Sequence, residues 1–189
     1  MNKISIISSS VRDGRKSNNV ALYFKNYIHE NKLAEAEILD LKEFNFPLFE
    51  ERLKFQKNPS KQLLDFTNTI VSSDGILIVT PEYNGGIPAS LKNVIDVLYD
   101  EWHHQPIALC TASAGAFGGS QVVMSLQFTL WKMHAITVPE IFHVPTVQNS
   151  FDELGNPKDK VGTDKRASIF IKELLWFIEA KKQMKNREV

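Results

Sequence analysis

The sequence has little of what marks extracellular, membrane-spanning or nucleic-acid-binding proteins. Its 189 residues include one cysteine, so the chain cannot form an internal disulfide or a cysteine-ligated structural zinc site. No apolar run approaches the roughly 18 residues that a membrane helix needs, and we expect no signal peptide. Twenty-two basic and twenty-two acidic residues cancel, which argues against a broad phosphate-binding face. We therefore expect a cytoplasmic protein whose partners are neither membrane nor nucleic acid.

The most informative stretch is residues 76–99. An apolar run at 76–79 predicts a buried parallel strand. Residues 81–86, PEYNGG, end it with a proline and a glycine pair that can expose backbone amides. A helix follows, with Pro88 suited to its first turn. Its apolar face consists of Ile87, Leu91, Val94, Ile95 and Leu98. This arrangement puts 81–86 at the carboxyl edge of a sheet, where ligands bind; an ordinary strand-to-helix connection is the alternative.

The residue identities favour the binding loop. Residues 81–102, PEYNGGIPASLKNVIDVLYDEW, closely resemble the signature of NADPH-dependent FMN reductases, a flavodoxin-like family that includes quinone, azo-dye and chromate reductases. The positions that match in register are Pro81, Tyr83, Asn84, Gly85, Pro88, Leu91, Lys92, Asn93 and Asp96. The resemblance implies that the flavin ring lies against Pro81, Glu82, Tyr83, Asn84 and Gly85. The family has Gln or Glu at position 82, and a carboxylate there would lower the potential of the flavin.

A second polar loop, residues 8–19, follows the apolar run at 4–7. Hydroxyls, amides and arginines before a helix form an anion site, because the helix dipole and unpaired N–H groups favour negative charge. Ser17 or Asn18 could cap that helix. A capped surface loop is the alternative. The spacings of a triphosphate loop and of a dinucleotide fingerprint are both missing.

This loop resembles the phosphate loop of the same reductase family, although Ser9 stands where the family often has glycine. The resemblance implies that Ser10, Arg12, Ser17 and Asn19 bind the FMN phosphate. Arg15 is a weaker candidate for the 2′-phosphate of NADPH.

A third loop, residues 111–120, is rich in small side chains, which let a flat ring approach backbone amides. The resemblance implies that Ser113, Gly115 and Gly118 contact the other edge of the flavin. No Gly-x-Ser-x-Gly elbow accompanies these serines, so a hydrolase is not indicated.

Strand and helix patterns alternate along the chain, which predicts one domain over residues 1–189. The expected strands are 4–7, 37–41, 76–79, 106–110 and 138–144, with Pro139 marking a strand start or an edge. A flavodoxin-like three-layer sandwich with a five-stranded parallel sheet of order 2-1-3-4-5 would bring the three polar loops to one rim. The helix starting at 59–60 should bury Leu63, Thr67, Ile70 and Val71. The last helix, 163–185, should bury Ile171, Leu174 and Ile178.

Four other features bear on sites and partners. Cys110 ends an apolar strand and is expected to be a buried, inert thiol. His103 and His104 have no third ligand at a suitable spacing, so we expect no metal site. Trp102 packs either on a partner subunit or in the core.

Residues 121–133 are apolar nearly all round, which predicts a homodimer through this helix and the helix after Pro88, with a tetramer as a further option. A more enclosed helix is the alternative.

The resemblance implies an FMN-dependent NAD(P)H oxidoreductase with a ping-pong hydride mechanism. NADPH or NADH reduces the flavin and leaves before a quinone, an azo compound, free flavin or a similar small acceptor takes the electrons. No side chain is then expected to be catalytic, because the flavin carries the chemistry. Two alternatives remain: a flavodoxin-like electron carrier, and an FMN-binding sensor without NAD(P)H oxidation.

Overall fold

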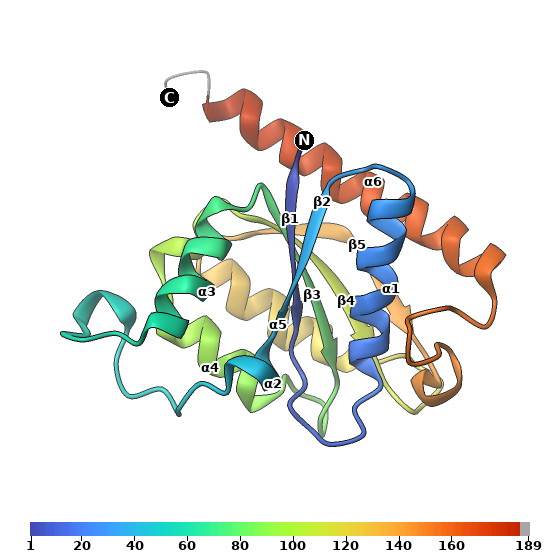
Figure 1. Ribbon diagram of the computed structural model, residues 1–189, viewed down its shortest axis with the longest axis horizontal. Helices are drawn as coiled ribbons and strands as arrows, with labels where there is room; N and C mark the ends of the chain where they lie inside the picture. Colours follow the sequence, from blue (N-terminus) through green and yellow to red (C-terminus); the bar gives the residue numbers. More distant parts are fainter. Residues whose placement is uncertain (186–189) are drawn as a thin grey trace.

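The five predicted strands form one parallel sheet in the order β2-β1-β3-β4-β5 (Figure 1). The strands are β1 (Lys3–Ser8), β2 (Glu35–Asp40), β3 (Gly75–Pro81), β4 (Pro106–Ala112) and β5 (Ile136–Val144). The computed structural model describes residues 1–185, and the last four residues of the expected domain lie outside that range. The observed strand order confirms the predicted flavodoxin-like order 2-1-3-4-5.

Helices cover both faces of the sheet (Figure 1). They are α1 (Ser17–Glu30), α2 (Leu41–Phe44), α3 (Lys61–Ser72), α4 (Ala89–Val97), α5 (Ser120–Lys132) and α6 (Lys160–Lys185), with 3-10 turns η1 (Leu53–Phe55), η2 (Asp100–Trp102) and η3 (Val147–Asn149). α1 and α6 pack on one face, whereas α3, α4 and α5 pack on the other. Within the described residues, no helix is both long and apolar enough to cross a membrane.

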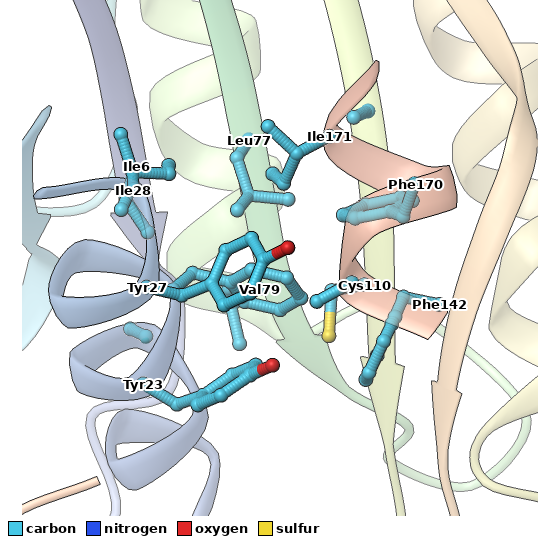
Figure 2. Packing of buried hydrophobic residues seen from close by; sticks show 14 of the residues in the cluster. Ile6, Tyr23, Tyr27, Ile28, Leu77, Val79, Cys110, Phe142, Phe170 and Ile171 are labelled. Carbon is cyan, nitrogen blue, oxygen red and sulfur yellow. The ribbon is translucent and has the colours of Figure 1, made fainter. Parts of the chain in front are cut away.

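The core has two layers because β3 buries successive side chains on opposite faces. Leu77 and Val79 meet α1 and α6, and Figure 2 shows them beside Tyr27 and Phe170. Ile76 and Ile78 belong to the other layer. Each such side chain stabilises the fold by about 1.5–3 kcal/mol. The apolar run at 76–79 is therefore the central strand that its composition predicts.

The surroundings of Trp102 and Cys110 test two predictions from the sequence. Trp102 is fully buried and its indole N–H donates to the Ile95 carbonyl, 3.3 Å away, so it packs in its own core and not on a partner. Cys110 is fully buried, as predicted, and burial raises the pKa of its thiol.

Several local predictions are wrong. α1 begins at Ser17 with Lys16 as its N-cap, so neither Ser17 nor Asn18 caps it. The side chain of Asn18 instead accepts a hydrogen bond of 2.9 Å from the Ser8 hydroxyl. Val71 is 57% exposed, so it does not belong to the buried face of α3. α6 starts at Lys160, before the predicted boundary at residue 163.

β5 is an edge strand, as Pro139 indicates. Its pairing with β4 passes from Ile107 with Thr137 to Leu109 with Ile141, so β4 advances two positions while β5 advances four. Pro139 lies within this bulge, where its missing N–H interrupts no regular ladder.

Candidate functional site

Three loops at the carboxyl edge of the sheet form the candidate site (Figure 1). They are residues 9–16 after β1, 82–88 after β3 and 113–119 after β4. Parallel strands bring these connections to one edge, as the sequence predicts. Specific hydrogen bonds then join each loop to the next.

The first link joins the loops after β1 and β3. The hydroxyl groups of Ser10 and Tyr83 lie 2.6 Å apart, and the side chain of Ser10 is buried. The guanidinium carbon of Arg12 lies 5.5 Å from the centre of the Tyr83 ring, while Arg12 itself is exposed. Two predicted phosphate residues thus contact a residue predicted to meet the flavin ring.

The loop after β1 contains buried polar atoms that lack partners. Among the described residues, Ser9 Oγ, Ser17 Oγ and Asn19 Nδ2 are buried and make no hydrogen bond. A buried polar group without a partner costs about 1–3 kcal/mol, so such atoms are rare outside functional sites. Ser17 and Asn19 lie in the first turn of α1 and Ser9 directly follows β1, which indicates a place for a polar, anionic ligand. Ser9 was not predicted as a contact, although it belongs to a run of three serines that could have signalled it.

Arg15 does not have the role that the sequence suggests. Its guanidinium group makes a two-nitrogen contact with the Asp40 carboxylate and also donates to the Ser10 carbonyl at 2.5 Å. Lys42 Nζ makes a second contact with the loop, an ion pair of 2.6 Å with the Asp13 carboxylate. The hydrogen bond from Lys42 and its positive charge lower the pKa of Asp13. Arg15 therefore fastens the loop to the end of β2 and is not free for the 2′-phosphate of NADPH.

The loop after β3 is a tight turn. Tyr83 and Gly86 exchange backbone hydrogen bonds of 3.0 Å, and the two residues between them have positive φ, 52° at Asn84 and 76° at Gly85. Two successive positive φ angles are typical of a type I′ turn, for which Asn-Gly is the preferred pair. The Asn-Gly pair therefore fixes the shape of the loop.

Glu82 provides the second link. Its carboxylate accepts hydrogen bonds from the backbone N–H groups of Gln121, at 2.9 Å, and Val122, at 3.3 Å. The N-cap residue of α5, Gly119, has no side chain to satisfy these donors. Glu82 N–H also donates to the Ala112 carbonyl at 3.2 Å. Glu82, predicted as a flavin contact, thus uses its side chain to hold the loop after β3 against α5.

The loop after β4 packs against the end of β5 and the residues that follow it. Ser113 N–H donates to the Val144 carbonyl at 3.1 Å, and the Gly115 carbonyl accepts from Thr146 at 3.2 Å. Gly118 is buried, and a Cβ there would lie 3.0 Å from atoms of β5 and the residue after it. Within residues 1–185, no hydrogen bond joins Ser113, Gly115 or Gly118 to the loops after β1 and β3. Glu82 instead joins the loop after β3 to the two elements that flank the loop after β4, through Ala112 of β4 and the first turn of α5.

His143 supports this third loop and was not predicted. The Thr111 hydroxyl group donates its proton to the Gly118 carbonyl at 2.7 Å, so the hydroxyl oxygen of Thr111 accepts a hydrogen bond from His143 Nδ1 at 2.8 Å. The arrangement places a proton on Nδ1 of His143. No local sequence pattern marks this pair, because 32 positions separate the two residues.

Comparisons with known proteins identify the family of the chain. The model of the family described as NADPH-dependent FMN reductase matches residues 2–149. The chain belongs to this family. Membership makes it an oxidoreductase that uses FMN, with NAD(P)H as electron donor. The matched region contains all three loops, and the whole of α6 lies beyond its end.

Sequence relatives of this FMN reductase extend the comparison. The NAD(P)H-dependent FMN reductase LOT6 of Saccharomyces cerevisiae is 33% identical over 68% of this chain and 73% of its own length. An NADPH azoreductase of a Bacillus species is 26% identical over 98% and 97% of the two chains. A quinone reductase of Pseudomonas putida is 34% identical over 61% and 65%.

A solved structure supports the fold. The flavoenzyme FerB of Paracoccus denitrificans, an NAD(P)H:(acceptor) oxidoreductase, superposes with a TM-score of 0.75 over 95% of this chain and 98% of its own. The two chains are 18% identical, so the likeness concerns the fold alone.

The donor set of the first loop fits FMN. A phosphate monoester offers several strong acceptor oxygens, which match the unpartnered hydroxyl groups of Ser9 and Ser17 and the amide of Asn19. Arg12 adds a positive charge at the surface of the same loop. The polar atoms that the protein leaves without partners are therefore those that a phosphate group requires.

Proposed function

We propose that the chain is an NAD(P)H oxidoreductase in which the three loops hold FMN and serve a small acceptor by a ping-pong mechanism. The observation that carries this proposal is the group of buried, unpartnered polar atoms at Ser9, Ser17 and Asn19. Bound FMN would supply the redox chemistry, taking a hydride from the nicotinamide and passing electrons to the acceptor. The side chains of the protein would bind and orient FMN and the substrates, and they would exclude water from the site.

The phosphate would be held by Ser10, Arg12, Ser17 and Asn19, with Ser9 as an additional contact. Charge-assisted hydrogen bonds contribute about 1.5–3 kcal/mol each, so a few of them account for tight retention of the cofactor. Ser10 is fixed by Tyr83. The phosphate subsite and the ring subsite would therefore form together.

The ring would lie against Pro81, Tyr83, Asn84 and Gly85. Their turn is rigid before any ligand arrives, because Tyr83 and Gly86 close it with two backbone hydrogen bonds. Preorganised backbone donors stabilise negative charge on a bound group without reorganisation. Glu82 would act through position, by keeping this turn against α5, and Ser113, Gly115 and Gly118 would border the site on the side of β5.

The acceptors we propose are quinones, azo compounds, free flavin and similar small molecules. The reductases that resemble this chain are named for FMN, azo compounds and quinones. All three acceptor types are flat and take up two electrons. A site that leaves one face of the flavin open suits such molecules better than a protein partner.

We also propose a homodimer that forms through α5. Met124, Phe128 and Trp131 are 79%, 67% and 69% exposed, and they are spaced at helical intervals on one face. A stripe of this size marks a contact surface. Among residues 1–185, α4 adds no large exposed apolar side chain, so the support lies on α5. Pairing of dimers into tetramers and the cytoplasmic location stay predictions.

The decisive experiment is a visible spectrum of the protein saturated with FMN, recorded before and after anaerobic addition of NADPH. Bleaching of the flavin band, followed by its return when a quinone or azo dye is added, is the expected result. A bound flavin that stays oxidised would contradict the proposal and favour an electron carrier. Failure to bind FMN would favour neither the reductase nor the electron carrier. It would also refute the assignment of the residues that bind the FMN phosphate.

A further inference from the structure

A groove of about 1110 Å³ lies at the amino-terminal edge of the sheet, opposite the candidate flavin site. Its walls are the end of α3, the segment before β4, the start of β5 and the last turns of α6. In Figure 1, α6 crosses this end of the molecule beside the start of β1. Small-molecule sites commonly measure about 300–1,000 Å³, so the groove can hold an organic ligand.

Apolar side chains of α3 and α6 line the groove and are exposed to solvent. Val71, Trp176 and Met184 are 57%, 62% and 55% exposed. The rings of Trp176 and Phe177 meet edge to face, with centroids 4.9 Å apart and an interplanar angle of 79°. A tryptophan held in this way offers a flat apolar surface, and its side chain loses little conformational entropy when a ligand covers it.

The groove also contains a fixed ammonium group. Lys181 Nζ donates to Gln105 Oε1 at 2.6 Å, and Gln105 is 4% exposed. Gln105 is itself held, because its side-chain amide donates to the Ile70 carbonyl at 3.3 Å. An ammonium group has three donors, so Lys181 keeps donors for a ligand while its position is set by a buried neighbour.

Two lysines and one carboxylate act on the charge of Lys181. Within the part of the chain that the structure describes, no carboxylate lies within ion-pair distance of Lys181 Nζ, and Asp74 pairs with Lys182 at 3.0 Å. Burial, followed by repulsion from Lys185 and Lys182, lowers the pKa of Lys181 to about 8, while Asp74 opposes this effect. A bound anion would relieve that repulsion.

The acidic residues of the groove are engaged on its other wall. Asp100 lies 3.8 Å from both Lys54 and His103, and Glu101 accepts a hydrogen bond from Tyr99 N–H at 2.8 Å. The wall formed by α6 therefore combines a flat apolar surface with positive charge.

We propose that this groove binds a flat organic anion, such as an aromatic carboxylate or sulfonate. Its apolar body would pack on Trp176, and its anionic group would accept hydrogen bonds from the Lys181 ammonium. The site is separate from the flavin site and does not depend on the proposed reaction.

The test uses the FMN-saturated protein and two fluorescent probes, anilinonaphthalene sulfonate and its uncharged analogue phenylnaphthylamine. Saturable binding of one sulfonate probe per chain is expected. Lys181→Met should weaken the sulfonate by about tenfold or more, because it removes a charge-assisted hydrogen bond, and should leave the neutral probe unchanged. Lys172→Met, an exposed lysine on the same helix, is the matched control and should change neither.

Trp176→Ala supplies a second arm at an exposed position that the fold does not need, and it should weaken both probes. Trp131→Ala, in the apolar stripe of α5, should weaken neither. Equal effects of the two lysine variants, or loss of binding in Trp131→Ala but not in Trp176→Ala, would overturn the proposal. A change of oligomeric state in Trp176→Ala would also overturn it, because a second copy of the chain would then occupy the groove.

Discussion

The hydroxyl groups of Ser10 and Tyr83 lie 2.6 Å apart although 73 positions separate them in the chain. This contact joins the loop predicted to bind phosphate to the loop predicted to bind the flavin ring. We expect Ser10→Ala and Tyr83→Phe each to weaken FMN binding by a few-fold, since a hydrogen bond contributes about 0.5–1.5 kcal/mol. The double variant should lose less than the sum, as measured by fluorescence titration of apoprotein with FMN. Fully additive losses would show that the two residues act independently.

Ser17→Ala should have opposite effects on the apoprotein and on cofactor binding. The buried Ser17 hydroxyl has no partner among the described residues, so its removal should leave the unfolding free energy of the apoprotein unchanged or raise it. FMN affinity should fall by about tenfold, because one phosphate contact is lost. Thermal unfolding without FMN and flavin titration measure the two effects. A variant that destabilises the apoprotein and keeps its FMN affinity would refute the phosphate assignment.

Glu82→Ala should destabilise the first turn of α5. The carboxylate satisfies two N–H groups that Gly119 cannot cap, and loss of such a cap costs about 0.5–2 kcal/mol. Urea unfolding of the apoprotein measures this cost. Glu82→Gln keeps an acceptor oxygen and should recover most of it. If both variants were as stable as wild type and only the flavin potential changed, Glu82 would act on the ring and not on the loop.

Lys181 should make stability depend on pH in the alkaline range. Its pKa in the folded chain, about 8, lies below the ordinary value of 10.5, so the unfolded chain binds more protons between these values. Unfolding free energy therefore gains a contribution as pH rises through this window. The gain is of order 1 kcal/mol once exposure to solvent is allowed for. Lys181→Met should lack this rise relative to wild type, whereas Lys172→Met should retain it, as urea unfolding at pH 7 and pH 10 would show.

Phe128→Glu should convert the proposed dimer to a monomer. The phenyl group is 67% exposed at the middle of the α5 stripe, and a carboxylate at the centre of an apolar contact would be desolvated without a partner. Sedimentation velocity measures the change. Phe55→Glu, 61% exposed in the segment before α3, is the control and should leave association unchanged. An unaltered dimer in Phe128→Glu would place the interface elsewhere.

Much of the fold could be predicted because its signals are local. The apolar run of β3, the Asn-Gly turn and the periodic face of α4 each reflect short-range preferences that agree with one another. Strand order followed from three polar loops that share one rim. The serines and asparagines of the first loop were also visible, since anion sites at helix N-termini use few residue types.

Other features could not be predicted because they depend on distant partners. The sequence suggested that Arg15 could bind a ligand, whereas in the structure its guanidinium group pairs with Asp40 at the end of another strand. Asn18 was an acceptable cap by propensity, but the Ser8 hydroxyl holds its side chain. The hydrogen bonds from the N–H groups of α5 to the Glu82 carboxylate were also not visible in the sequence, and its flavin contact stays a prediction. For Arg15 and Asn18 a long-range hydrogen bond overrode a local preference.

The bulge around Pro139 has a consequence for behaviour at high concentration. A straight edge strand invites another chain to extend the sheet, which is a common first step of amyloid-like aggregation. On β5 the uneven advance against β4 and the absent proline N–H break the regular row of donors and acceptors that an incoming strand would need. The bulge therefore makes the β5 edge a poorer template for strand addition than a straight edge strand would be.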